Sequence, residues 1–259
     1  MMRTQPLAMD SLTYIGHATA LIRLEGSSLL TDPFLRDWLG PLHRHGPSPG
    51  PEVATTPDAV LISHLHMDHL DLASIRRVPA GTPVVIPRGA RKMLAKADVD
   101  RIHEVGVGET VSVDGFELTA VPASHDGHRR RWGLEIEPLG YLIQRGDRTV
   151  YFAGDTDLFP GMAEFGPVDV ALLPVWGWGP TVGPGHLDPE SAAAALALIR
   201  PRIAVPIHWG TIYPAGLSRL RPRPLVEPPL AFARRAREIA PDVDVRVVQP
   251  GGETPLELT

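Results

Sequence analysis

The segment that covers residues 59–72 constrains this chain more than any other part of its sequence. Its letters are AVLISHLHMDHLDL, an apolar run followed directly by a cluster of metal-binding residue types. Alternate residues of an extended segment point to one side, so His64 and His66 are expected to face one ion. Asp68 and His69 follow at the turn, where they can face a second ion. The segment therefore predicts a metal-binding loop at the end of a buried strand.

The amino-acid composition restricts the chemistry of such a loop. The chain has 259 residues, eleven histidines and no cysteine. Disulfides, thiol nucleophiles, iron–sulfur clusters and cysteine-held zinc are therefore excluded. Imidazole and carboxylate ligands together suit Zn²⁺, with Mn²⁺ or Fe²⁺ as alternatives. A folded chain of this mass buries roughly three quarters of its extended surface, enough for one large core. We expect a single domain over residues 1–259.

The net charge and the hydropathy pattern indicate where the protein works and what it binds. The formal charge is -5 and the isoelectric point about 6.1, which argues against a nucleic-acid surface. No run approaches 18 apolar residues, and the first residues lack the apolar stretch of a signal peptide. These features predict a soluble, cytoplasmic protein with a small-molecule substrate, without a nucleic-acid partner or stable membrane association. They leave the oligomeric state open.

Glycine and proline punctuate short apolar runs along the chain, which favours strands bounded by turns. The expected strands are Leu12–Ile15, Ala20–Leu24, Ser28–Thr31, Ala59–Ser63, Pro83–Ile86, Phe116–Pro122, Gly140–Gln144, Thr149–Ala153, Asp169–Pro174, Ile203–Ile207 and Val243–Val248. Strands and helices alternate through most of the chain, so the expected fold class is α/β.

Three segments are expected to be helices. The clearest begins after Asp188, an N-cap residue followed by proline at the first helical position, and ends before Pro201. Segments near Arg88–Ala97 and Leu230–Ile239 are the other two, and the second shows apolar residues at similar helical spacing.

Two proline-rich stretches, residues 40–57 and 213–229, match no expected element. Loops of this length usually act as functional lids or are mobile insertions, so substrate choice is expected to lie there. The first stretch contains His43 and His45 at ligand spacing, but no strand aims them. We expect these two histidines to be solvated.

With its H-x-H-x-D-H loop after a buried strand, the chain resembles the metallo-β-lactamase superfamily. That resemblance implies a third histidine, a bridging aspartate and a last histidine, each at the end of a later strand. The sequence supplies His125 in FELTAVPASHDG, Asp155 in RTVYFAGDTD and His208 in RIAVPIHWGT. The implied fold is a four-layer αβ/βα sandwich with halves near residues 1–135 and 136–259.

Other motifs are similar to one branch of this superfamily. TYIGHATALIRLEGSSLLTDPFL, HLDPESA and PIHWGT resemble the branch of bacterial ascorbate-6-phosphate lactonase and N-acyl phosphatidylethanolamine phospholipase D. The resemblance implies two ions bridged by Asp155, with a hydroxide between them that attacks a carbonyl or phosphorus. Asp68 and His186 are the candidate catalytic residues, and either His186 or a metal-bound water protonates the leaving oxygen. The implied activity is hydrolysis of a lactone or a phosphodiester, and a metal-dependent ligand-binding or partner protein without turnover is the alternative.

Several residues near these motifs have weaker expectations. The segment Arg129–Arg131 is either a solvated loop or a binding site for a phosphate or carboxylate, which favours an anionic substrate. His17 is expected to pack beneath the loops as a structural residue. Asp32 is either an orienting partner of a ligand histidine or an ordinary turn residue. Trp176 and Trp178 are either pocket walls or core residues.

Overall fold

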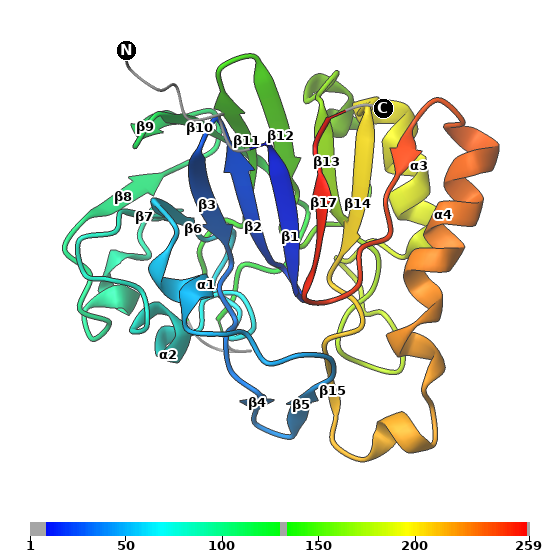
Figure 1. Ribbon diagram of the computed structural model, residues 1–259, viewed down its shortest axis with the longest axis horizontal. Helices are drawn as coiled ribbons and strands as arrows, with labels where there is room; N and C mark the ends of the chain where they lie inside the picture. The colour runs from blue at the N-terminus through cyan, green and yellow to red at the C-terminus, as the bar shows by residue number, and fades with distance from the viewer. Residues whose placement is uncertain (1–8, 130–133, 258–259) are drawn as a thin grey trace, which may run out of the picture.

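The computed structural model describes residues 9–129 and 134–257, and it builds them into two large sheets that face each other (Figure 1). The larger hydrophobic core contains residues of both sheets, such as Leu12 and Leu118. Short helices cover the outer face of one sheet, and two longer helices pack against the other. This arrangement is the four-layer αβ/βα sandwich that the sequence predicts.

The first sheet has seven strands of mixed direction. In spatial order these are β17 (Gly252–Pro255), β1 (Ser11–Gly16), β2 (Thr19–Leu24), β3 (Ser27–Thr31), β6 (Ala59–Leu61), β7 (Val84–Pro87) and β8 (Ile102–Val105). Its parallel strands β6 and β7 are apolar throughout because both faces are covered. In β7, Val85 belongs to the core between the sheets, whereas Val84 and Ile86 belong to the outer core beneath the short helices.

The second sheet also has seven strands. In spatial order these are β16 (Asp244–Val245), β14 (Ile203–Ile207), β13 (Val170–Pro174), β12 (Arg148–Phe152), β11 (Leu139–Arg145), β10 (Phe116–Pro122) and β9 (Thr110–Val113). The predicted halves are therefore misplaced. The hairpin β9–β10 pairs with β11, so the change of sheet comes between Val105 and Thr110, and β17 returns to the first sheet.

The helices differ in length between the two outer layers. The α-helices are α1 (Glu52–Thr55), α2 (Leu72–Ile75), α3 (Pro189–Ile199) and α4 (Glu227–Ile239), and the 3₁₀ turns are η1 (Arg91–Leu94), η2 (Pro160–Glu164), η3 (Leu217–Arg219) and η4 (Arg223–Leu225). Figure 1 shows α3 and α4 side by side at one flank and α1 and α2 at the opposite flank. The predicted cap of α3 is confirmed, because the Asp188 side chain accepts from the Ser191 N–H at 2.8 Å.

Some expected elements have different bounds. The predicted helix Arg88–Ala97 is wrong, and only the turn η1 forms in this segment. The hydrogen bonds of the segment link residues three apart, as in a 3₁₀ helix; the Ala97 N–H, for example, donates to the Leu94 carbonyl. Helix α4 starts earlier than predicted, with Pro228 and Pro229 in its first turn, where missing N–H groups cost nothing. The predicted strand Val243–Val248 keeps only the two residues of β16, which pair with β14.

The two proline-rich stretches do contain regular structure, contrary to expectation. They meet in a third sheet made of β15 (Ile212–Pro214), β5 (Leu42–Arg44) and β4 (Trp38–Leu39), at the lower end in Figure 1. Pairing of Tyr213 with His43 joins the two stretches across the chain. Each segment is too short to be recognised alone, because its apolar partners come from the other stretch.

The described residues, with the gap at residues 130–133, include no helix with the length and apolarity that a membrane crossing requires.

Candidate metal centre

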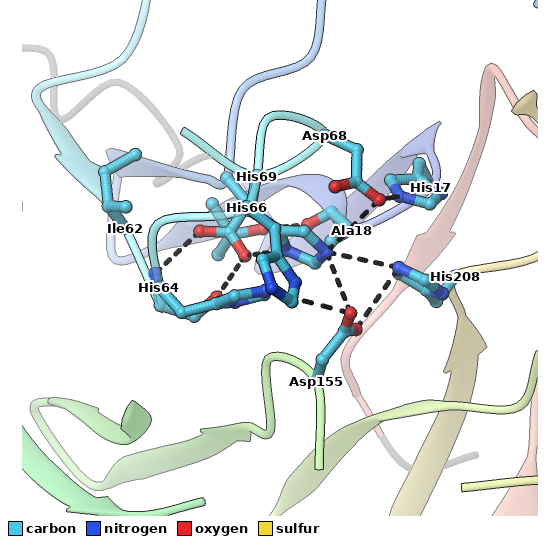
Figure 2. Close-up of polar contacts among 12 residues, drawn as sticks. His17, Ala18, Ile62, His64, His66, Asp68, His69, Asp155 and His208 are labelled. Carbon is cyan, nitrogen blue, oxygen red and sulfur yellow. Dashed lines mark hydrogen bonds and ion pairs between the residues drawn. The ribbon is translucent and has the colours of Figure 1, made fainter. Parts of the chain in front are cut away.

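The seven side chains that the sequence predicts as metal ligands converge at one edge of the two sheets. The loop after β6 carries the cluster of residues 64–69, and later loops follow β10, β12 and β14. These later loops place His125, Asp155 and His208 against the cluster. Figure 2 shows Asp155 between the histidines of the cluster and His208. Four separate chain segments therefore supply one site.

The first donor group consists of His64, His66, His125 and Asp155, whose donor atoms all lie within 4.8 Å of one another. His125 Nε2 is 3.1 Å from His66 Nδ1. The Asp155 Oδ2 atom is 3.9 Å from His64 Nε2 and 3.9 Å from His125 Nε2. Ring nitrogens that face each other at such distances suit a shared cation better than mutual hydrogen bonding.

The second donor group consists of His17, Asp68, His69 and His208, within the same 4.8 Å limit. His69 Nε2 is 3.2 Å from His208 Nε2. Asp155 contacts this group too: its Oδ2 is 3.0 Å from His69 Nε2 and its Oδ1 is 3.2 Å from His208 Nε2. Asp155, a member of the first group, thus lies close to histidines of both groups, the position that a bridging ligand would occupy.

Hydrogen bonds on the far side of the rings fix which nitrogen faces the centre. His69 Nδ1 donates to Asp32 Oδ2 at 2.7 Å, and His208 Nδ1 donates to the Trp176 carbonyl at 3.0 Å. His125 Nδ1 donates to the Gly185 carbonyl at 2.7 Å. A proton held on Nδ1 leaves the Nε2 lone pair directed inward, which is how proteins orient metal-binding histidines.

Asp32 therefore orients the site instead of serving as a plain turn residue. Its carboxylate also accepts from the Ser63 N–H at 2.7 Å and the Ser63 hydroxyl at 2.5 Å. Ser63 in turn lies 2.9 Å from His64 Nδ1. One buried carboxylate thus supports a histidine of each donor group.

The protonation of the site differs between its members. Burial holds the pKa of His64 and His208 well below the usual value. Burial also lowers the pKa of His69, but the nearby carboxylates, Asp155 foremost, outweigh it and raise that pKa well above the usual value. Burial raises the pKa of Asp155, but His208 and His69 outweigh it and hold that carboxyl ionised. The site thus combines neutral imidazoles at His64 and His208 with a His69 that the carboxylates hold protonated until a cation replaces that proton.

The donors present fit divalent metal ions. His64 Nε2 is buried and has no hydrogen-bond partner among the residues that the structure describes. An inward, unpartnered imidazole nitrogen beside an ionised carboxylate is costly unless a cation satisfies both. Nitrogen and carboxylate oxygen donors suit Zn²⁺ and other first-row divalent ions.

His17 lies closer to this chemistry than sequence reasoning places it. It is buried as expected, but its Nε2 is 2.9 Å from Asp68 Oδ2 and its ring centroid is 3.8 Å from that of His208. The His208 N–H donates to the His17 carbonyl at 2.7 Å, and both residues have a positive φ. The one signal in the sequence was its place in the G-H-A-T segment, next to a glycine.

His186 also lies beside Asp155. Its Nδ1 donates to the Pro184 carbonyl at 3.1 Å, and its Nε2 is 3.4 Å from Asp155 Oδ2. Burial lowers its pKa, but the hydrogen bond and charge of Asp155 outweigh burial and raise it. The His186 side chain faces a cavity of about 410 Å³ above the donors.

The two tryptophans after β13 have different surroundings. Trp176 is half-buried, and its Nε1 donates to the Gly179 carbonyl at 3.0 Å. Trp178 lines the cavity and is exposed. The pocket-wall interpretation therefore holds for Trp178.

The other candidate residues fall outside the centre. His43 and His45 are half-buried beside Trp38 and Tyr213 in the third sheet, so the prediction that they are solvated is wrong. Arg129 lines the cavity, but its guanidinium donates to the Leu65 carbonyl at 2.6 Å. The rest of the predicted anion-binding segment, residues 130 and 131, lies outside the described residues.

Comparisons with known proteins agree with this fold and site. The family model described as the beta-lactamase superfamily domain matches residues 28–209. The chain therefore belongs to the beta-lactamase superfamily. It is 33% identical over 252 residues to a UPF0173 metal-dependent hydrolase of Methanopyrus kandleri, covering 93% of this chain and 97% of the relative.

Two further matches belong to other organisms. The chain is 30% identical over 245 residues to N-acyl-phosphatidylethanolamine-hydrolyzing phospholipase D 1 of Caenorhabditis elegans, covering 82% of this chain and 67% of the relative. The structure of Igni18, a metallo hydrolase from Ignicoccus hospitalis, superposes with a TM-score of 0.72 at 26% identity. That match covers 97% of this chain and all of the other. The first of these matches agrees with the branch that the sequence motifs resemble, and the second agrees with a metal-dependent hydrolase fold.

Proposed function

We propose that this protein is a hydrolase that uses two divalent ions, Zn²⁺ foremost, to cleave an ester-type bond in a small molecule. The observation that carries the proposal is Asp155, which contacts both donor groups at the base of the 410 Å³ cavity. The relatives named as metal-dependent hydrolases support it. The bond that is cleaved is the ester bond of a lactone or one of the ester bonds of a phosphodiester.

The first donor group, which includes Asp155, would hold one ion. The other ion would be held by Asp68, His69 and His208, with Asp155 shared between the two. Such a pair of ions supplies Lewis acidity and activates water at neutral pH. The chain's own residues position these donors: Asp32 fixes His69, and the Trp176 carbonyl fixes His208. Asp68 is held in place by His17.

His186 supplies the proton for the departing oxygen in this proposal. Its Nδ1–H is committed to the Pro184 carbonyl, so the remaining nitrogen, Nε2, is the one that faces Asp155 and the cavity. A group that leaves from a substrate in the cavity is within reach of that nitrogen. His186→Gln should lower kcat most for substrates with poor leaving groups, because only these need protonation.

A parallel screen tests the proposal. The metal-loaded protein is assayed against lactones, phosphodiesters and phosphorylated sugars, with Asp155→Asn as the blank. Turnover of one class by the wild type and not by the blank supports the proposal. Tight binding of about two ions per chain without turnover of any compound favours instead a ligand-binding protein of the same fold.

A further inference from the structure

The cavity above the donors has a base and walls of opposite character. Polar groups form the base, where His66, Asp68, Asp155 and His186 meet. The walls are apolar and come from three segments of the chain. They are made of Leu39, Pro41 and Leu42 from the hairpin of β4 and β5, Met67 from the loop after β6, and Trp178 from the loop after β13.

Two of the wall residues are exposed although they are large and apolar. Met67 has 43% and Trp178 45% of its surface accessible, and both flank residues of the metal centre. A single exposed apolar side chain is ordinary, but several that converge on one concave site mark a binding surface. The wall gains an apolar partner only when a ligand enters.

The hairpin that carries much of the wall is anchored to the rest of the molecule. Leu42 is buried against Phe34 and Ile212. The Ala215 N–H donates to the Pro41 carbonyl at 3.0 Å. The wall is therefore formed before a ligand binds, which lowers the entropic cost of recognition.

The charges around the cavity do not favour an anion at the walls. Arg129 is the one arginine or lysine among the described residues that line it, and its guanidinium donates to the carbonyls of Leu65 and Leu70. Those bonds brace the metal loop from behind. The carboxylates of Asp68 and Asp155 lie at the base, where they would hold the ions, so beyond Arg129 no described side chain of the walls offers a positive charge to an anionic substituent.

We infer that this cavity binds an uncharged apolar group, an alkyl or acyl chain of several carbons attached next to the bond that is cleaved. The inference rests on the proposed function, because it places the scissile bond over the donor groups. It adds an apolar group beside the scissile bond, whatever charge that bond itself carries. Trp178 is the residue that distinguishes long from short chains.

A chain-length series tests this inference. The metal-loaded protein is assayed with 4-nitrophenyl acetate, butanoate and hexanoate, and with methyl and hexyl 4-nitrophenyl phosphodiesters. We expect kcat/KM to rise about threefold with each methylene. The 4-nitrophenyl ester of adipic acid, which matches hexanoate in carbon number but ends in a carboxylate, should react more slowly than the hexanoate.

A matched pair of tryptophan variants assigns the effect to the wall. Trp178→Ala should remove most of the chain-length dependence while the metal content and the thermal midpoint stay unchanged. Trp38→Ala removes another exposed tryptophan of the same region that does not line the cavity, and it should keep the dependence. An equal loss in both variants contradicts the role of Trp178.

A binding measurement separates the inference from the proposed function. Hexanoate should raise the thermal midpoint of the metal-loaded protein more than acetate does, and Trp178→Ala should abolish the difference. The apolar subsite is overturned if hexanoate and acetate shift the thermal midpoint equally, or if kcat/KM does not change with chain length. It is also overturned if the adipate ester reacts faster than the hexanoate. If no ester or phosphodiester of any length is hydrolysed, the proposed function fails. The thermal midpoint shifts with hexanoate and acetate still decide whether the apolar subsite exists.

Discussion

The two donor groups use similar ligands but differ in how the protein encloses them. The first group opens on the cavity, with His66 half-buried at its base. The second group is buried, and Asp68 is its one member among the described residues that line the cavity. Within this group His17 contacts Asp68, and Asp32 holds His69 from outside it. The contrast indicates that the first group presents His66 and Asp155 to a substrate, whereas most of the second group lies deeper.

Removing the bridge between the groups should have the largest effect. Asp155→Asn keeps the shape of the side chain but loses the negative charge that faces His69 and His208. Turnover should fall by more than the roughly 10- to 100-fold typical of residues that only orient a ligand. Metal content by elemental analysis should fall as well. Two retained ions with near wild-type activity would remove Asp155 from the bridging role.

Removing the shared support should have the next largest effect. In Asp32→Asn the oxygen that accepts from His69 can become a nitrogen, which disturbs the ring orientation. Metal affinity should fall by about 10- to 100-fold, measured by competition with a chelating dye.

Asp58→Asn is the matched control for this change. Asp58 accepts from the Ser28 N–H at 2.8 Å in the same sheet, away from the centre. The metal affinity of the Asp58→Asn variant should equal that of the wild type. If both variants lose affinity equally, Asp32 acts through general stability and not through His69.

The metal affinities of the two groups should depend differently on pH, because the pKa of His69 is raised and that of His64 is lowered. His69 has a raised pKa, so metal binding to the second group must displace a proton. Its affinity should rise by about tenfold per pH unit between pH 6.5 and the raised pKa of His69. His64 has a lowered pKa and is already neutral above pH 6.5, so the affinity of the first group should be flat there.

Calorimetric metal titrations in buffers of different ionisation enthalpy measure this proton release. Two binding steps with different proton counts are expected. Equal proton release in both steps would show that the groups are not distinct in this respect.

The smallest effect is expected at His17. His17→Phe keeps a ring beside His208 but loses the contact with Asp68. The affinity of the His17→Phe variant for one of the two ions should fall by up to about tenfold. This is the low end of the loss expected when a residue that orients a metal ligand is removed. His103→Phe, a half-buried histidine of β8, should leave both affinities unchanged. Equal weakening of both ions in His17→Phe would mean that His17 supports the whole site, not one group.

Much of this centre could be predicted from the sequence because its donors are grouped or follow strands. The H-x-H-x-D-H loop is contiguous, so its chemistry is visible without a fold. His125, Asp155 and His208 are far apart, and their placement depended on resemblance to a known superfamily. His17 was placed too far from the chemistry, since its neighbours Asp68 and His208 come from distant loops.

The local order of residues determined the metal-binding loop, the capped start of α3 and the exclusion of cysteine chemistry, since each depends on neighbours in the chain. Tertiary structure alone decided which sheet the hairpin β9–β10 joins and how β5 meets β15. It also decided that apolar walls stand over the metal centre. Such contacts join segments far apart in sequence, and their energy comes from burial against partners that no single segment specifies.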